Sequence, residues 1–102
     1  MFNIIHQKAL LKYAYRHPDA KNSLFEWYHT FQEQSFSNFN ELKSSYGSAS
    51  IIGDNRVIFN ILGNKYRLIV RISFMYKTAQ IKWFGTHAEN DKLDATTVQP
   101  KP

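Results

Sequence analysis

The sequence predicts an α+β fold, in which helices come first and a small, mainly antiparallel sheet follows. Apolar residues recur at helical spacing through the first half of the chain, and β-prone runs with alternating side chains fill residues 50–84. The connections between these runs are short enough for an antiparallel meander. The 102 residues suffice for one domain with its own core, and 43% apolar content is typical of a globular protein.

The N-terminal half is predicted to hold an opening strand and two helices. Residues 2–5 are β-prone, and apolar positions at helical spacing predict a helix over residues 7–15. His17-Pro18 should end this helix and place Pro18 in the first turn of the second. An aromatic stripe in the second helix could line a cofactor pocket, but packing on the sheet is far more common. The stripe consists of Leu24, Trp27, Tyr28 and Phe31. Residues 40–43 are consistent with one or two further helical turns.

Four strands are predicted in the second half, over residues 50–52, 56–61, 65–74 and 78–84. The third of them divides into two faces, because side chains alternate along a strand. Lys65, Arg67 and Arg71 face one way, and the apolar residues from Tyr66 to Phe74 face the other. Gly63-Asn64 should supply the positive φ angles of the preceding turn. In the last strand, Ile81 and Trp83 are expected opposite Lys82 and Phe84.

A short C-terminal helix should follow the sheet. Thr86 stands three residues before Glu89, which is the spacing of a capping box. After Ala95 the chain has little to bury. We therefore expect one domain over residues 1–94 and a flexible C-terminal tail over residues 95–102.

Positive charge is concentrated in the predicted sheet. The formal net charge is +5, which on its own favours a polyanionic partner only modestly. Residues 56–82, however, contain no acidic residue and six basic ones, namely Arg56, Lys65, Arg67, Arg71, Lys77 and Lys82. A field of one sign over a sheet favours nucleic acid binding.

Several classes of site are absent from the sequence. The chain has no cysteine, no glycine-rich phosphate loop and no serine in a nucleophile elbow, and we expect no cofactor. Among the four histidines, His87 has two carboxylates close after it, Glu89 and Asp91, but these side chains lack a common helical face, so a metal site there is a minor alternative. No signal peptide or membrane-spanning run is found, and we expect a cytoplasmic protein without membrane contact.

The basic face and the segment after the last strand together fit RNA cleavage without a metal. This reaction needs a base for the 2′-hydroxyl, cations for the phosphorane and an acid for the 5′-oxygen. Arg67 and Arg71, with Lys65 and Lys82 beside them, could supply the charge. His87 and Glu89 could supply proton transfer. A solvated basic face next to a capped helix explains the same spacing, so both interpretations stay open at this point.

Two motifs carry a resemblance to a known family. They are "GNKYRL" at residues 63–68 and "GTHAENDKL" at residues 85–93, accompanied by "HPDA" at 17–20 and "WY" at 27–28. On these residues the chain resembles the HigB-type toxins of bacterial toxin–antitoxin modules, which belong to the RelE-like superfamily. The resemblance implies a RelE-like fold with two N-terminal helices packed on the sheet. It also implies an endonuclease (mRNA interferase) that cuts mRNA on the ribosome and inhibits translation.

The resemblance further implies a partner and a set of site residues. The partner is a HigA-type antitoxin with a helix-turn-helix, so that contact with DNA is only indirect, through the antitoxin. Arg67, His87 and Glu89 are implied as catalytic, and Asn64 and Lys65 as contacts to RNA, to which the charge pattern adds Arg71 and Lys82.

Asn90 is a further expected contact to RNA, but it departs from the family pattern, which usually has tyrosine at this position. Without the tyrosine ring, the site lacks a surface on which an RNA base could stack. It also lacks a phenol that could take part in proton transfer. One hypothesis is therefore that Asn90 weakens the endonuclease. The alternative function is a non-catalytic or inactivated module that binds its antitoxin or nucleic acid.

Overall fold

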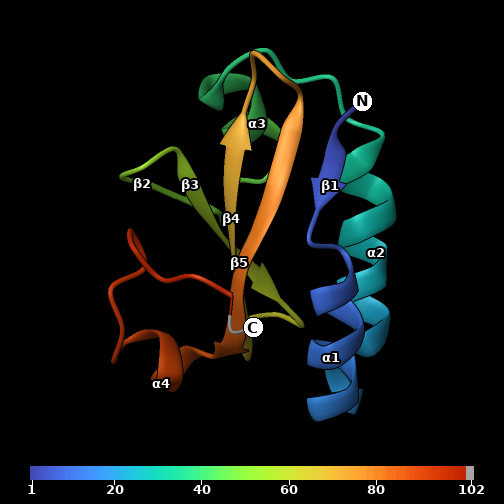
Figure 1. The fold of residues 1–102 in the computed structure, drawn as a ribbon, viewed down its shortest axis with the longest axis vertical. Helices are drawn as coiled ribbons and strands as arrows, with labels where there is room; N and C mark the ends of the chain where they lie inside the picture. Colours follow the sequence, from blue (N-terminus) through green and yellow to red (C-terminus); the bar gives the residue numbers. More distant parts are fainter. Residues whose placement is uncertain (101–102) are drawn as a thin grey trace.

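A single five-stranded sheet forms the centre of the molecule, as the computed structural model of residues 1–100 shows (Figure 1). Its order is β1-β5-β4-β3-β2, with β1 parallel to β5 and every other pair antiparallel. The strands are β1 (Asn3–Ile5), β2 (Ser50–Ile52), β3 (Arg56–Ile61), β4 (Tyr66–Ser73) and β5 (Thr78–Thr86). The predicted α+β class and mainly antiparallel sheet are confirmed.

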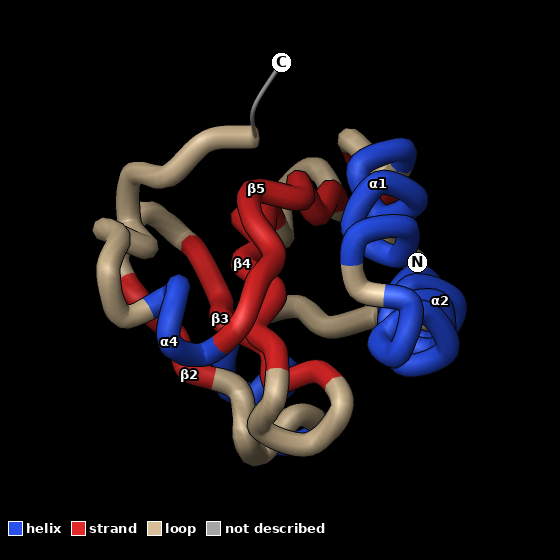
Figure 2. Tube along the Cα trace, turned by 90° about the horizontal axis from the view of Figure 1, so that it is seen from below, coloured by secondary structure: helices blue, strands red, loops and turns tan. Residues whose placement is uncertain are grey.

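Helices lie on both sides of this sheet. The helical elements are α1 (Lys8–Arg16), the 3₁₀ turn η1 (Pro18–Ala20), α2 (Lys21–Gln32), α3 (Phe39–Ser45) and α4 (His87–Asn90). Figure 2 shows α1 and α2 on one side of β4 and β5, and α4 with the chain that follows it on the other. The short C-terminal helix is confirmed. Pro18 opens η1 rather than the second helix itself, and the N-terminal half contains α3 besides α1 and α2.

The core lies between the sheet and α2. Leu24, Trp27 and Phe31 of α2 are buried, and Trp27 stacks on Phe31 with ring centroids 5.2 Å apart. Phe59 of β3 meets Phe31 edge-on at 5.5 Å. Each of these large side chains contributes about 1.5–3 kcal/mol by its burial. The aromatic stripe of the second helix is therefore a packing surface.

A β-bulge in β5 changes which side chains face the core. Ile69 of β4 pairs with Trp83 whereas Val70 pairs with Ile81, so Lys82 is the additional residue. Phe84 consequently faces the core and stacks on Tyr66. Trp83 lies with Ile69 on the face turned away from α1 and α2, which is the second face of the sheet. The prediction that placed Phe84 opposite Ile81 was wrong, because it assumed an uninterrupted alternation of side chains.

Two tight connections set the registers of the sheet. Leu62 and Gly63 have φ angles of 55° and 65°, one residue earlier than predicted, before β4. Asp54 and Asn55 have φ angles of 62° and 57° in the connection of β2 to β3. Positive φ at two successive residues is the backbone of the tight hairpin turn whose twist matches that of the flanking strands.

The chain after α4 crosses the second face of the sheet (Figure 2). Arg56 Nη1 donates hydrogen bonds to the carbonyl oxygens of Ala95 at 3.1 Å and Val98 at 2.6 Å. Lys82 Nζ donates to Gln99 Oε1 at 2.9 Å. The expected flexible tail over residues 95–102 thus has defined contacts as far as Gln99, whereas residues 101 and 102 lie outside the described part. Its flexibility in solution stays a prediction.

Candidate functional site

Arg67, His87 and Asn90 come together where β5 runs into α4. Arg67 of β4 pairs in register with Gly85 of β5, and α4 begins two residues later with His87. Arg67 Nη1 donates to Asn90 Oδ1 at 3.2 Å, and Arg67 Nη2 contacts His87 Nε2. Because a guanidinium can only donate, this contact is a hydrogen bond when Nε2 accepts, that is, when the imidazole is neutral with its proton on Nδ1. The contact thus joins a permanent cation to a proton acceptor.

Arg67 also has an unused donor. Its Nε is buried and has no hydrogen-bond partner in the described part of the chain. A buried donor without a partner costs about 1–3 kcal/mol, so such groups are uncommon in folded proteins. Because Nε has almost no exposed surface, an anion could bind this donor only after the arginine side chain or its neighbours had moved.

Glu89 belongs to the capping box that begins α4, as the sequence predicted. Its Oε1 accepts from the Thr86 backbone N–H at 2.8 Å, and Thr86 Oγ1 accepts from the Glu89 backbone N–H at 3.2 Å. The hydrogen bond from the Thr86 backbone, with smaller help from its hydroxyl, lowers the pKa of Glu89. The side chain is therefore a carboxylate committed to the cap and a poor proton donor.

Gly85 provides the space in which Trp83 and Glu89 meet. A Cβ atom at Gly85 would lie 2.6 Å from Cη2 of Trp83 and 2.9 Å from Glu89 Oε1. Real Cβ atoms do not approach other atoms so closely, so a side chain here would displace the indole or the capping carboxylate. The glycine of the "GTH" motif is thus a steric requirement of the turn that presents His87.

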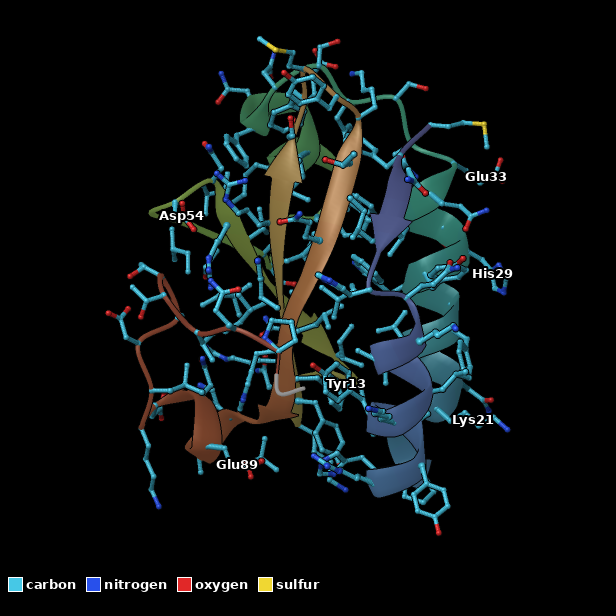
Figure 3. All side chains as sticks on the ribbon, viewed as in Figure 1. Tyr13, Lys21, His29, Glu33, Asp54 and Glu89 are labelled. Atoms are coloured by element: carbon cyan, nitrogen blue, oxygen red, sulfur yellow. The ribbon has the colours of Figure 1, made fainter. Side chains whose placement is uncertain are left out.

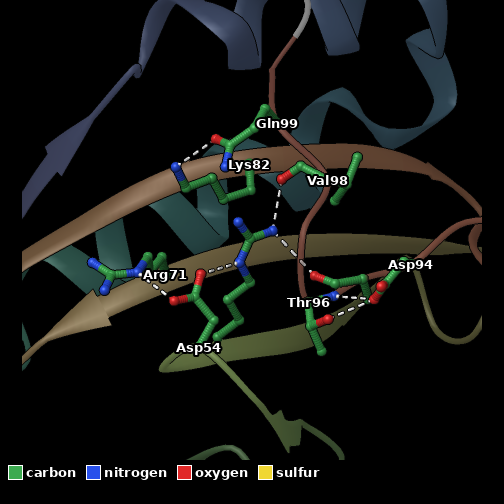
Figure 4. Close-up of polar contacts among 9 residues, drawn as sticks. Asp54, Arg71, Lys82, Asp94, Thr96, Val98 and Gln99 are labelled. Carbon is green, nitrogen blue, oxygen red and sulfur yellow. Dashed lines mark hydrogen bonds and ion pairs between the residues drawn. The ribbon is translucent and has the colours of Figure 1, made fainter.

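A cluster of cations surrounds Asp54, on the same face of the sheet as Arg67 (Figure 4). Arg56 Nε donates to Asp54 Oδ2 at 3.0 Å, and Arg71 Nε lies 3.4 Å from Asp54 Oδ1. The hydrogen bond from Arg56 is the main cause that lowers the pKa of Asp54. Lys82 lies beside them, and burial, together with the charges of Arg56 and Arg71, lowers its pKa. The structure thus brings together the predicted Arg71 and Lys82.

Arg56 is the residue of this cluster that the sequence argument missed. It stood in the acid-free run, but no motif separated it from the other basic residues. Its side chain is only 1% exposed and donates to the backbone carbonyl oxygens of Ala95 and Val98. A burial of this kind depends on a contact between residues about forty positions apart, which leaves no local pattern.

Asn64 and Lys65 lie in the connection between β3 and β4. Lys65 precedes the first residue of β4, and its Nζ pairs with Asp19 of η1. The Tyr66 hydroxyl donates to the other Asp19 oxygen at 2.8 Å, and the Lys65 hydrogen bond is the main cause that lowers the pKa of Asp19. Lys65 reaches α4 through its carbonyl, which accepts from the His87 N–H at 3.3 Å. The expected basic face is therefore shared by Arg67 and Arg71 but not by Lys65.

The sequence matches the model of a known protein family. A family model described as HigB toxin, the RelE-like toxic component of a toxin–antitoxin system, matches residues 20–93, which is well over half of the sequence. The chain belongs to the HigB toxin family. As a HigB-family toxin it has an antitoxin as its partner, and RelE-like toxins generally have ribonuclease activity. No curated protein matches the sequence.

The described part of the chain contains neither a metal-binding cluster nor a membrane-spanning helix. Within residues 1–100, no three His, Asp or Glu side chains lie close enough together to hold a metal ion. None of the helices described is long and apolar enough to cross a membrane.

Proposed function

We propose that this HigB-family toxin is a ribosome-dependent mRNA endonuclease, which inhibits translation by cutting mRNA without a metal. The contact between Arg67 and His87 carries the proposal, because it joins two of the groups that such a cleavage needs, a cation and a proton acceptor. The protein would act in the cytoplasm, where the ribosome and its mRNA are found. A HigA-type antitoxin with a helix-turn-helix would neutralise it and would provide the only link to DNA.

In the proposed reaction His87 acts as the base. When a phosphate takes the Nη2 donor of Arg67, His87 Nε2 is released to accept the proton of the neighbouring 2′-hydroxyl. The 2′-oxygen then forms a bond to phosphorus, and the bond from phosphorus to the 5′-oxygen breaks. The 5′-oxygen takes up a proton from solvent water, and the protonated His87 returns its proton to the solvent. Arg67 stabilises the charge on the phosphorane. The products are a 2′,3′-cyclic phosphate and a 5′-hydroxyl end.

Glu89 has a positioning role in this proposal. Its carboxylate holds the first turn of α4 and therefore the place from which His87 reaches Arg67. Substitutions separate this role from proton transfer. Glu89→Gln keeps an oxygen that accepts from the Thr86 N–H and should retain most cleavage, whereas Glu89→Ala removes the cap and should lose it. Loss of cleavage in Glu89→Gln, with α4 intact by NMR, would instead assign a proton-transfer role.

The decisive experiment analyses the RNA ends formed in a purified translation system. The wild-type chain should produce fragments with 2′,3′-cyclic phosphate ends, and His87→Ala should abolish them. Fragments with 3′-hydroxyl and 5′-phosphate ends would indicate attack by water and contradict the mechanism. Lys21→Ala is a matched control, because this exposed lysine lies on α2, on the opposite side of the sheet from α4 (Figure 3).

Asn90 favours a second candidate function, a non-catalytic module that binds its antitoxin or nucleic acid. Its amide oxygen takes a donor of Arg67, and the position offers no aromatic ring for a base. Absence of cleavage by the wild type and by Asn90→Tyr on translating ribosomes would establish this second candidate. Co-expression with the protein of the adjacent gene tests the antitoxin, which should relieve growth arrest.

A further inference from the structure

Three cations meet on the second face of the sheet with a single carboxylate between them. Arg56, Arg71 and Lys82 come from three neighbouring strands, and Asp54 is the acid that contacts the two arginines. Arg56 and Lys82 are almost completely buried, at 1% and 8% exposure. Buried charge is costly unless a charged or hydrogen-bonding partner compensates it. The three cations exceed Asp54 by two positive charges, and the carboxylate of Asp94, in the segment that follows α4, lies within electrostatic range of Arg56.

Neutral oxygen atoms of the C-terminal segment, defined here as residues 94–99, fill the remaining places around the cluster (Figure 4). The carbonyl oxygens of Ala95 and Val98 accept from Arg56, and the Gln99 amide oxygen accepts from Lys82. Three oxygen atoms thus converge on the two buried cations. A phosphate presents the same kind of acceptor with a negative charge, and hydrogen bonds to a charged acceptor are roughly twice as strong as neutral ones.

We propose that the C-terminal segment occupies a phosphate subsite formed by Arg56, Arg71 and Lys82, and that the RNA backbone displaces the segment when it binds. The proposal rests on the proposed function, since the RNA is the strand that is cut beside His87. Arg67 and Arg71 lie four residues apart on the same face of β4, a separation of about 13 Å. A single-stranded RNA that runs along β4 can therefore contact the cleavage site and this subsite at the same time.

The attachment of the segment suits such an exchange. Within residues 1–100, its side-chain hydrogen bonds to the sheet are those from Arg56 and Lys82. Its other polar contacts are internal, as in the Thr96 N–H and hydroxyl that donate to Asp94 Oδ1 at 2.9 and 2.6 Å. Release of the segment therefore leaves unpartnered only the donors that a phosphate then takes.

A disulfide can hold the segment in place in the full-length chain. A Cβ atom at Gly53 would lie 3.5 Å from Cγ2 of Thr96, and φ at Gly53 is not positive, so a cysteine fits there without backbone strain. The natural chain has no cysteine, so the double variant Gly53→Cys/Thr96→Cys can form only this intramolecular bridge. Reduction releases the segment in the same molecule.

Affinity for a short fluorescein-labelled single-stranded RNA is measured by anisotropy with the bridge oxidised and then reduced. The reduced form should bind like the wild type, and the oxidised form should bind about tenfold or more weakly. For the oxidised form, the slope of log K against log salt should also be shallower by about 0.7, because one phosphate fewer of the single-stranded RNA is neutralised. The wild type under both redox conditions is the control. Equal affinities of the oxidised and reduced forms would overturn the proposal.

A second pair of variants tests the subsite without a bridge. Gln99→Glu places a carboxylate beside Lys82 and should fasten the segment, whereas Gln32→Glu makes the same charge change at the end of α2. RNA affinity should fall at least about fivefold more in Gln99→Glu; equal changes would contradict the proposal. Binding is measured away from the ribosome, so it separates the two proposals. If RNA binding depends strongly on the redox state of the bridge but no cleavage is found, the subsite proposal is supported and only the endonuclease proposal is contradicted.

Discussion

The guanidinium of Arg67 and the imidazole of His87 meet across the junction of β5 and α4, and the register of the sheet sets their separation. Arg67 pairs with Gly85, two residues before His87, so the turn through Thr86 decides where the imidazole lies. The same guanidinium reaches Asn90 at the other end of α4. Arg67 therefore holds the four-residue helix at both ends, besides providing the charge of the site.

Arg67→Lys should reduce mRNA cleavage by about 10²–10³-fold, as the loss of a transition-state donor does in other enzymes. A lysine keeps the positive charge but is a single point, so it cannot contact His87 and Asn90 together. The measurement is the fraction of a reporter mRNA cut in a translation extract, with the far-ultraviolet circular dichroism as a check of folding. Cleavage at the wild-type level by a folded Arg67→Lys variant would show that the paired contacts of the guanidinium to His87 and Asn90 are not needed for catalysis.

Asn90→Tyr should increase growth arrest on induction, because it restores an aromatic ring beside Arg67. The matched variant Asn90→Ala removes the acceptor of Arg67 Nη1 without adding a ring. This second variant should destabilise the fold by about 1–3 kcal/mol and should not increase arrest. Growth curves with equal expression levels provide the readout. Unchanged toxicity in Asn90→Tyr would show that the ring is not what limits activity.

Gly85→Ala should lower the free energy of unfolding by about 1–3 kcal/mol, the usual cost of overpacking. Its methyl group would meet the indole of Trp83 and the capping oxygen of Glu89. Gly47→Ala is the matched control, since no atom lies within 4 Å of the added carbon there. Urea denaturation should show a change of no more than about 0.5 kcal/mol for the control. Equal stability of the two variants would contradict the packing described for Gly85.

The stability of the Asp54→Asn variant should depend less on pH in the acid range than that of the wild type. The Arg56 hydrogen bond lowers the folded pKa of Asp54, so the stabilisation is present above the unfolded pKa of about 3.9. It is lost as the pH falls through the lower folded pKa. Urea midpoints of the wild type should therefore decrease more steeply than those of the variant between about pH 4 and about pH 2. Parallel curves would show that Asp54 does not contribute to acid unfolding.

Local patterns of the sequence predicted the parts of the site that depend on neighbouring residues. Period-two alternation placed Arg67 and Arg71 on one face, because β4 is uninterrupted between them. The Thr86 and Glu89 spacing predicted the cap, since both partners lie within one helical turn. Alternation failed at Lys65, where the strand has not yet begun, and after Lys82, where one additional residue reverses the faces.

Contacts between distant residues could not be predicted in this way. The sequence near Arg56 does not show that its partners are the backbone carbonyls of Ala95 and Val98, because carbonyl groups are the same in every residue. The polar composition after Ala95 likewise predicted a free tail. Only the arrangement of the strands shows that this segment lies over buried cations.

The parallel pairing of β1 with β5 has a consequence for the order of folding. Asn3 pairs with Thr78, so the first strand finds its partner only after three quarters of the chain has been synthesised. Pairing across such a sequence distance closes a long loop and slows folding. Because β5 also pairs with β4 and leads directly into α4, Arg67 and His87 meet only when this strand is in place. A nascent chain that ends before β5 therefore has neither a complete sheet nor an assembled site.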